Sequence, residues 1–359
     1  MEAEMQTKIH LVRQMLSQKG YDGVLINSQA NLAWLTGGRH FVNVASTDGV
    51  GAIFLGRERV EMLVNNIEGE RLWQEEGGAK ACDALTVYPW YEEELRAAFL
   101  EVRKHGLRVT TDNELRAEFL KLRLSLTAEE QERLRLLGRL TAEAVETAAR
   151  AAQPGQSEYE LAALLAKASY ERGLEPLVCL VGADERALTR RHPLPTDKRV
   201  AHYALFVLSA RRYGLVVSAS RAVHFGKVPE ELAQRQTAVN RVLGRMLAAS
   251  RMGASLGSVF KEGVAAYSEV GLPDEWQAHH QGGLAGYQSR EVRATASTDL
   301  VLESGMVLAW NPTIQGAKAE DTYLLTSEQL DNLTITGTWP RQRVEVLGQT
   351  FEVPWVLQR

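Results

Sequence analysis

The chain has 359 residues, of which 45% are hydrophobic and 24% are charged, and its formal net charge at pH 7 is −4. This composition is typical of a soluble globular protein, and the length predicts two domains. Without clustered positive charge, nucleic acid and anionic membranes are not expected partners.

No apolar run reaches the length that spans a bilayer, and the first residues lack a signal-peptide core. The two cysteines, Cys82 and Cys179, lie far apart in apolar surroundings, so we expect free thiols rather than a disulfide. Both observations favour a cytoplasmic location.

The first third of the chain alternates between helical and strand-like patterns. Apolar residues recur at helical spacing from Lys8 to Lys19, and Gly20 then supplies a stop. Strand-like runs follow at 23–28, 49–56, 60–65, 85–90 and 107–112. The pattern predicts an α/β domain over residues 1–124.

A second region opens at Thr127, where Thr127–Glu130 has the sequence of a capping box, and Ser157–Glu160 repeats it. Strand-like runs dominate from Val178 onward, interrupted by helical patterns at 230–251 and 256–271. We therefore predict an α+β domain of long helices on a curved, largely antiparallel sheet over residues 125–345. Residues 346–359 are set apart as a C-terminal extension.

Residues 205–226 form the pattern of a hairpin that carries a site. Two apolar runs flank the turn Arg211–Gly214, and short polar residues interrupt both runs. No Asp or Glu occurs between Tyr203 and Val228, however, so this hairpin offers no carboxylate.

The order of several motifs resembles the creatinase/prolidase/aminopeptidase P family, whose second domain has the "pita-bread" fold. The resemblance covers nearly the whole chain, and it rests on the hairpin and on the motifs NLAWLTG, PGQSEYELAALL, RHPLPTD, HHQGGLAGYQSRE, LESGMVLAWNP and AEDTYLLT. It implies a homodimer and a small-molecule or short-peptide ligand.

The peptidases of this family hold their metals with two Asp, one His and two Glu. Matching the motifs places these ligands at Val207, Ser218, Gly283, Asn311 and Glu320, so the resemblance leaves one ligand in five. Hard divalent cations need several anionic oxygens. We therefore expect a degenerate metal site, with no metal and no other cofactor.

His192 matches the family histidine on the substrate side of the site, which transfers the proton in creatinase. A histidine is a suitable general acid or base where no metal activates water. The alternative is a histidine that caps a proline-rich loop.

His279 and His280 are adjacent, so on a strand at most one of them faces the cavity, and the sequence leaves open which one. His279 matches the first histidine of the family motif and is the candidate catalytic residue, with His280 as a substrate-binding candidate.

Glu320 is the third catalytic candidate, because a buried carboxylate without metal can act as a base or bind a cationic group. Substrate-binding candidates are Glu291, Arg221 and Asn311. Two structural alternatives stay open: a surface ion pair between Arg290 and Glu291, and an ion pair between Arg221 and Glu320.

Three functions are compatible with these residues. The first is a metal-independent hydrolase that cleaves a C–N bond of a small molecule, as creatinase does. The second is a non-catalytic binding protein on the pita-bread scaffold. The third is a Xaa-Pro peptidase, which the loss of metal ligands disfavours.

Overall fold

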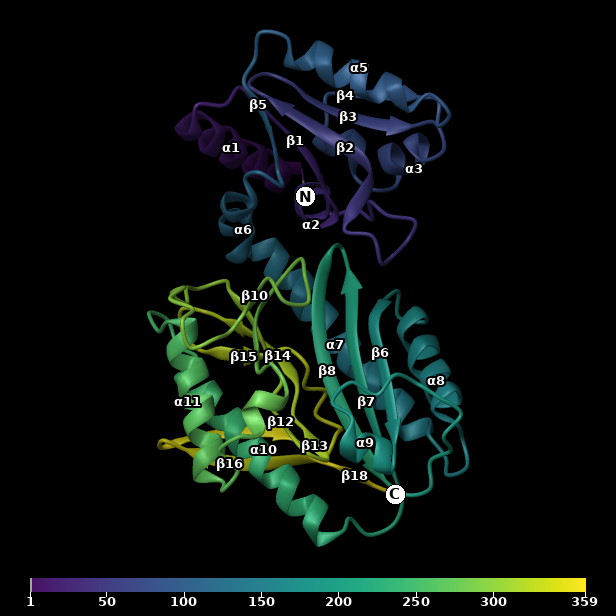
Figure 1. The fold of residues 1–359 in the computed structure, drawn as a ribbon, viewed down its shortest axis with the longest axis vertical. Helices are drawn as coiled ribbons and strands as arrows, with labels where there is room; N and C mark the ends of the chain where they lie inside the picture. The colour runs from purple at the N-terminus through teal and green to yellow at the C-terminus, as the bar shows by residue number, and fades with distance from the viewer. Residues whose placement is uncertain (1) are drawn as a thin grey trace. The chain divides into compact units, whose positions relative to one another are not determined.

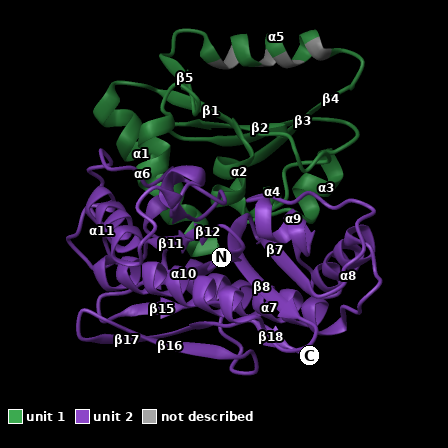
Figure 2. Ribbon diagram, turned by 60° about the horizontal axis from the view of Figure 1, so that its bottom comes forward, with its two compact units in different colours: residues 1–123 green, residues 124–359 purple. Residues whose placement is uncertain are grey.

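The computed structural model describes the backbone of residues 2–359, and their side chains except at positions 93, 96, 99, 102 and 103. The chain divides into two compact units, residues 1–123 and 124–359, coloured separately in Figure 2. The predicted α/β domain followed by an α+β domain is confirmed. In the part of the chain described, no helix is both long and apolar enough to cross a membrane.

Unit 1 is a mixed five-stranded sheet in the order β4-β3-β2-β1-β5, with helices around it (Figure 1). The central pairs β1–β2 and β2–β3 are antiparallel, whereas β4 and β5 pair in parallel with β3 and β1. The strands are β1 (Gly23–Ser28), β2 (Asp48–Gly56), β3 (Val60–Asn65), β4 (Ala84–Tyr88) and β5 (Val109–Thr111). The helices are α1 (Glu2–Lys19), α2 (Gln29–Thr36), α3 (Gly69–Gln74), α4 (Gly78–Ala81), α5 (Glu93–Lys104) and α6 (Arg116–Leu124).

The long helices of unit 2 begin where the sequence signals placed them. Thr127 and Ser157 are the N-caps of α7 and α8, and both form complete capping boxes with Glu130 and Glu160. The helices are α7 (Ala128–Ala151), α8 (Glu158–Tyr170), α9 (Glu185–Thr189), α10 (Glu230–Ala249), α11 (Leu256–Glu269) and the 3-10 helix η1 (Glu275–Ala278).

The strands of unit 2 form two larger sheets, ordered β18-β8-β7-β6 and β10-β9-β11-β14-β15, and the two-stranded pairs β12–β13 and β16–β17. All pairs are antiparallel except β18 with β8. The strands are β6 (Glu175–Ala183), β7 (Tyr203–Arg212), β8 (Leu215–His224), β9 (Gly282–Ala285), β10 (Val292–Arg293), β11 (Val307–Trp310), β12 (Thr313–Ile314), β13 (Ala317–Lys318), β14 (Asp321–Leu325), β15 (Leu330–Asn332), β16 (Arg341–Val346), β17 (Gln349–Pro354) and β18 (Leu357–Gln358).

The predicted hairpin is β7–β8, closed by the two-residue loop Tyr213–Gly214. Both loop residues have positive φ, 54° and 77°, which matches the right-handed twist of the flanking strands. Val207 pairs with Ser220 and Phe206 with Arg221, so these two pairs lie on opposite faces of the hairpin.

Residues 346–359 are integrated into the sheets of unit 2. β17 pairs with β16, and β18 pairs with β8, where Arg359 O accepts a hydrogen bond from Gly226 N at 2.6 Å. The segment that the sequence analysis set apart therefore lies against the site hairpin.

Both cysteines are free thiols, as expected. Cys82 is buried, whereas Cys179 is only partly buried and its Sγ contacts Ala162 O at 3.7 Å. Burial raises the pKa of Cys82 to about 12, which keeps this thiol protonated and unreactive.

Candidate functional site

The extended segment from Lys318 to Thr322 separates two clusters of buried charge in unit 2. Successive side chains of an extended segment point to opposite sides. Lys318 and Glu320 accordingly face one cluster, while Asp321 faces the other.

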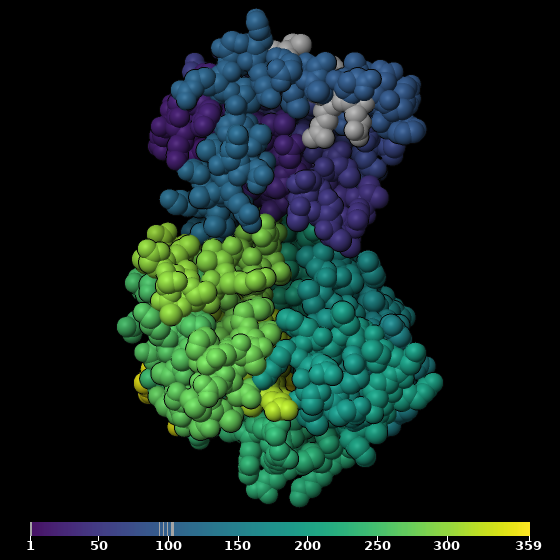
Figure 3. Space-filling view, viewed as in Figure 1, coloured from purple at the N-terminus to yellow at the C-terminus, as the bar shows by residue number. Residues whose placement is uncertain are grey.

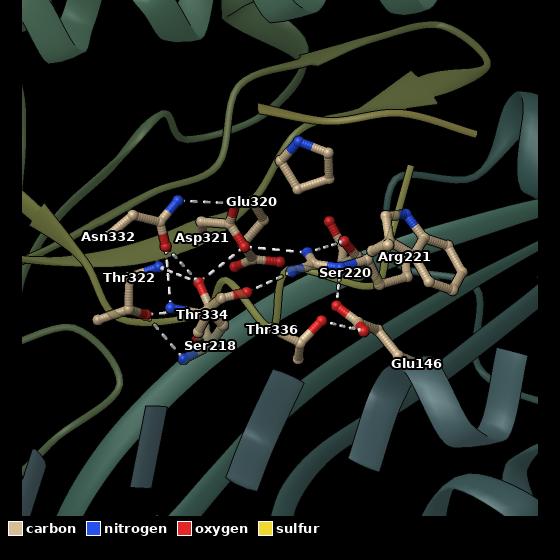
Figure 4. A network of polar contacts seen from close by, with 12 residues as sticks. Glu146, Ser218, Ser220, Arg221, Glu320, Asp321, Thr322, Asn332, Thr334 and Thr336 are labelled. Atoms are coloured by element: carbon tan, nitrogen blue, oxygen red, sulfur yellow. Dashed lines mark hydrogen bonds and ion pairs between the residues drawn. The ribbon is translucent and has the colours of Figure 1, made fainter. Parts of the chain in front are cut away.

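The Asp321 cluster centres on Arg221, whose side chain is 1% exposed (Figure 4). Its guanidinium donates to Asp321 Oδ1 at 2.9 Å and to Thr334 O at 2.6 Å, and lies 3.3 Å from Glu146 Oε1 on α7. Thr334 Oγ1 also donates to Asp321 Oδ1, at 2.7 Å. The cluster joins β8, β14 and α7. Its role is therefore structural.

The expected ion pair between Arg221 and Glu320 is therefore wrong. Arg221 lies on the hairpin face that contacts α7, and Asp321 rather than its neighbour Glu320 points there. The same geometry removes Arg221 from the substrate-binding candidates.

Glu320 instead lies between two other cations. Arg290 Nη2 donates to Glu320 Oε1 at 3.0 Å, and Lys318 Nζ lies 3.4 Å from Glu320 Oε2. All three side chains are nearly buried, with exposed fractions of 10% for Arg290, 3% for Lys318 and 4% for Glu320. We call this set the Glu320 cluster.

Burial acts on the pKa of each member. Burial alone would raise the pKa of Glu320, but the charges of Lys318 and Arg290 outweigh that effect and hold it below its usual value. Burial lowers the pKa of Lys318 and of Arg290, and Glu320 offsets only part of this. Glu320 is thus an ionised carboxylate already neutralised by protein cations, which disfavours its predicted role as a base.

Three histidines converge beside this cluster. The Nε2 atoms of His192 and His279 are 3.0 Å apart, and the ring centroids of His279 and His280 are 4.5 Å apart with the rings stacked. One ring nitrogen from each residue lies within 4.8 Å of the others. His192 is exposed, His279 is buried and His280 is intermediate, so the group reaches from the interior to solvent.

The expectation that at most one of His279 and His280 faces the site is wrong. These residues follow the 3-10 helix η1 and precede β9, which begins only at Gly282, so strand alternation does not govern them. Both rings lie close to His192.

The surroundings of the three imidazoles favour their neutral forms. Burial lowers the pKa of His279 to about 2 and of His280 to about 4, with smaller contributions from Lys318 and, for His280, Arg290. Burial and Lys318 also lower the pKa of His192. Three neutral imidazoles could hold a transition-metal ion, but the two cations of the Glu320 cluster repel one.

The two remaining substrate-binding candidates are Glu291 and Asn311, and neither belongs to the two charge clusters. Glu291 Oε1 accepts from Tyr287 N at 3.0 Å, whereas its neighbour Arg290 reaches Glu320, so the suggested Arg290–Glu291 pair gives way to Arg290–Glu320. Asn311 is buried after β11, and its Oδ1 has no hydrogen-bond partner among the described residues.

The residues present do not fit the two-metal centre implied by the family. On the hairpin, Val207 belongs to an apolar cluster, and Ser218 Oγ is hydrogen-bonded to Ser209 Oγ at 2.8 Å. Glu320 has two protein cations where metal ions would have to bind. Neutral groups and a single neutralised carboxylate cannot compensate two divalent ions.

The backbone packing around Gly283 leaves no room for the side chain of a metal-binding histidine. Gly283 has φ 147°, and a Cβ added there would lie 2.1 Å from Val292 O and 2.8 Å from Ala294 N. Any side chain would require β9 and β10 to move apart.

Lys318 is the site residue that sequence reasoning missed. Its signal was present, because residues two apart on an extended segment share a face and Lys318 precedes Glu320 by two. Arg191 was also missed; it pairs with Glu275, and its Nη1 is buried without a hydrogen-bond partner among the described residues.

Comparisons with known proteins agree with this fold. The family model "Metallopeptidase family M24" matches residues 132–327, and the model "Creatinase/Prolidase N-terminal domain" matches residues 8–133. No curated protein matches the chain.

Among solved structures, the prolidase from Pyrococcus horikoshii OT3 has 17% identity and a TM-score of 0.75, covering 92% of this chain and 98% of its own. The Xaa-Pro dipeptidase from Bacillus anthracis has 17% identity and a TM-score of 0.74, with the same coverages of 92% and 98%. The N-terminal domain of FACT complex subunit SPT16 from Cicer arietinum has 12% identity and a TM-score of 0.73, covering 94% and 97%. At these identities the likeness concerns the fold.

The Arg221 cluster generates a stability prediction. Asp321→Asn should lower the free energy of unfolding by about 3–5 kcal/mol, because it leaves a buried guanidinium without its nearest carboxylate. Urea denaturation measures the change. Asp331→Asn is the matched control, since Asp331 lies 3.4 Å from a partly exposed Arg135 and should lose less than about 1 kcal/mol. Equal losses in the two variants would contradict a structural role for the cluster.

The neutral histidines generate a pH prediction. The pKa values of folded His279 and His280, about 2 and about 4, lie below the value of roughly 6.5 in an unfolded chain. Below that pH the unfolded chain binds protons that the folded protein does not, so stability falls as the pH falls toward 4. Urea denaturation between pH 7 and 4 should show a shallower decline for the double variant H279N/H280N. An unchanged pH dependence would contradict neutral, buried imidazoles.

Proposed function

The chain belongs to metallopeptidase family M24, with a creatinase/prolidase-type N-terminal domain, and from this premise we propose that it hydrolyses a C–N bond without the family's two-metal centre. The substrate is a small molecule or a short peptide. The observation that carries the proposal is the 3.0 Å contact between the Nε2 atoms of exposed His192 and buried His279.

In this proposal His192 transfers the proton. A neutral imidazole at the surface of the site accepts a proton from water as the water oxygen attacks the carbon of the C–N bond. The bond to nitrogen then breaks, and the imidazolium returns the proton to the leaving nitrogen. The contact with His279 orients the His192 ring, and it requires that one of the two Nε2 atoms carries a proton while the other accepts it, which leaves His192 Nδ1 for the proton transfer.

The Glu320 cluster supplies the electrostatic part of the proposal. Metal ions stabilise negative charge on the reacting group in a metallopeptidase. Here the buried cations Arg290 and Lys318 stand beside the histidines, and Glu320 holds both in place.

We further propose a cytoplasmic homodimer. The two free thiols favour a reducing compartment, and a twofold dimer is the commonest symmetric assembly.

A non-catalytic binding protein is the second candidate. It is favoured by the Glu320 cluster, in which the carboxylate expected to do chemistry is engaged by protein cations.

Activity measurements distinguish the two candidates. Purified protein is assayed against amides, ureas, guanidino compounds and Xaa-Pro dipeptides, and His192→Ala should lower kcat by about 10²–10⁴-fold. His202→Ala is the control, because His202 is exposed and stacks on His224 rather than on the three histidines. Absence of turnover with every substrate class would favour the binding protein, whereas a fully active His192→Ala variant would contradict the proposed role of His192.

Metal content tests independence of the two-metal centre. Elemental analysis should find far fewer than two transition-metal ions per chain, and treatment with EDTA should leave turnover unchanged. Near two Mn, Co or Zn ions per chain, or Xaa-Pro cleavage restored by added metal, would overturn the proposal.

A further inference from the structure

We propose that His192, His279 and His280 bind a single transition-metal ion of the kind that imidazole prefers, such as Zn²⁺, and that the bound ion inhibits the proposed hydrolysis. The inhibition rests on the proposed function, whereas the binding does not. This site is separate from the two-metal centre of the family, because none of the three histidines occupies one of its ligand positions, which are Val207, Ser218, Gly283, Asn311 and Glu320.

The geometry of the three rings is the first argument. His192 Nε2 and His279 Nε2 are 3.0 Å apart, and one nitrogen of each of the three rings lies within 4.8 Å of the others. Two nitrogens bound to one tetrahedral Zn²⁺, each at roughly 2.0–2.1 Å from it, lie roughly 3.4 Å apart. The first pair is therefore almost in place. The ring of His280, which is only partly buried, completes the set by a shift of at most roughly 1.5 Å.

The lack of other partners is the second argument. His279 Nδ1 and His280 Nδ1 are buried and have no hydrogen-bond partner among the described residues. Within the part of the chain that the structure describes, the contact between His192 and His279 is the only ring hydrogen bond of the group. Buried polar atoms are normally satisfied, so rings brought together without such partners are costly unless something binds between them.

The neighbouring charges determine which ion can bind. The charges of Lys318, Arg290 and Glu320 all act on His192 and His280, and two of the three repel a cation. Glu320 attracts one, and its Oε2 has no hydrogen-bond partner among the described residues. Net repulsion disfavours hard ions such as Mg²⁺ and Ca²⁺, which need several anionic oxygens. Zn²⁺, Ni²⁺ and Cu²⁺ bind through the lone pairs of imidazole and tolerate it better.

An ion can reach the three rings from solvent. His192 is exposed and His280 is partly exposed, while His279 lies beneath them. Figure 3 shows the surface of unit 2 hollowed between its teal and light-green segments, the colours that the bar gives to the stretches around residues 192 and 280. Three protein ligands at an accessible position leave the fourth coordination position of Zn²⁺ to water.

Inhibition follows from the chemistry of the imidazole ring. A neutral ring has one nitrogen with a lone pair and one N–H. When His192 Nε2 donates its lone pair to the ion, His192 Nδ1 must carry the proton and can no longer accept one from water. The hydrogen that lay between the two Nε2 atoms moves to Nδ1 of its own ring, so no proton is lost. The ion thus blocks the general base of the proposed reaction.

Calorimetry tests the binding without any substrate. The metal-free, full-length protein is titrated with ZnCl₂, MgCl₂ and MnCl₂. We expect one Zn²⁺ to bind per chain, and Mg²⁺ and Mn²⁺ not to bind at the same concentration. Because no turnover is measured, Zn²⁺ binding can be found where the proposed hydrolysis fails, and the reverse.

Substitutions assign the bound ion to the histidines. Loss of even an outer partner of a metal ligand costs about 10–100-fold in affinity, so His280→Ala and His192→Ala should each weaken Zn²⁺ binding at least about tenfold. His202→Ala is the matched control and should bind as the wild type does, because His202 is exposed and stacks on a histidine outside the group.

Two further variants test the role of the neighbouring charges. Lys318→Met should strengthen Zn²⁺ binding, because it removes a repelling charge, and Glu320→Gln should weaken it, because it removes the attracting one. These opposite effects keep the test decisive if one of the variants fails to fold.

Turnover tests the inhibition. Saturating Zn²⁺ should abolish turnover of the metal-free protein, and EDTA should restore it. His280→Ala should need about tenfold more Zn²⁺ for the same inhibition.

Three outcomes would overturn the proposal. These are absence of Zn²⁺ binding, equal affinity for Zn²⁺ in His280→Ala and in the wild type, and turnover that Zn²⁺ raises. The last outcome would show that the ion activates water at this site instead of blocking His192.

Discussion

The alternation of side chains along residues 318–322 is the constraint on which the site depends. It sends Asp321 toward Arg221 and α7, and it sends Lys318 and Glu320 toward the histidines. One short segment thereby serves two purposes, since its two sides carry separate sets of charges. The Arg221 cluster holds β8, β14 and α7 together (Figure 4), while the Glu320 cluster lies on the other side of the segment.

The two clusters differ in how well their charges are compensated. Arg221 has two carboxylates and a carbonyl within reach, so its charge and its donors are satisfied inside the protein. Arg290 and Lys318 share the single carboxylate of Glu320, and among the described residues neither Arg290 Nε nor Glu320 Oε2 has a hydrogen-bond partner. Buried polar groups are normally satisfied in folded proteins. The difference therefore separates a cluster whose charges are satisfied inside the protein from one whose charges are only partly compensated.

The fold was predictable because its signals are local. The capping boxes at Thr127 and Ser157 involve residues three apart, and the hairpin turn at Tyr213–Gly214 lies between two obvious strands. The pairing of the buried charges was not predictable in the same way. Arg221 and Arg290 pair with carboxylates from distant segments of the chain, and the sequence does not say which carboxylate each cation meets.

The prediction that at most one of His279 and His280 faces the site failed for a different reason. The rule applied to His279 and His280 is correct for strands, but these residues lie between a 3-10 turn and β9. A shift of three residues in a strand boundary reverses the conclusion, and such boundaries are the least certain part of a sequence pattern. Lys318, in contrast, could have been found from its spacing to Glu320.

The close approach of strands at Gly282 and Gly283 limits what the middle of this sheet can accept. A Cβ at either position would meet a backbone oxygen 2.1 Å away. A larger residue at position 283 could therefore be introduced only together with a wider separation of β9 and β10, so a single substitution there would disrupt the sheet before its side chain could serve as a ligand.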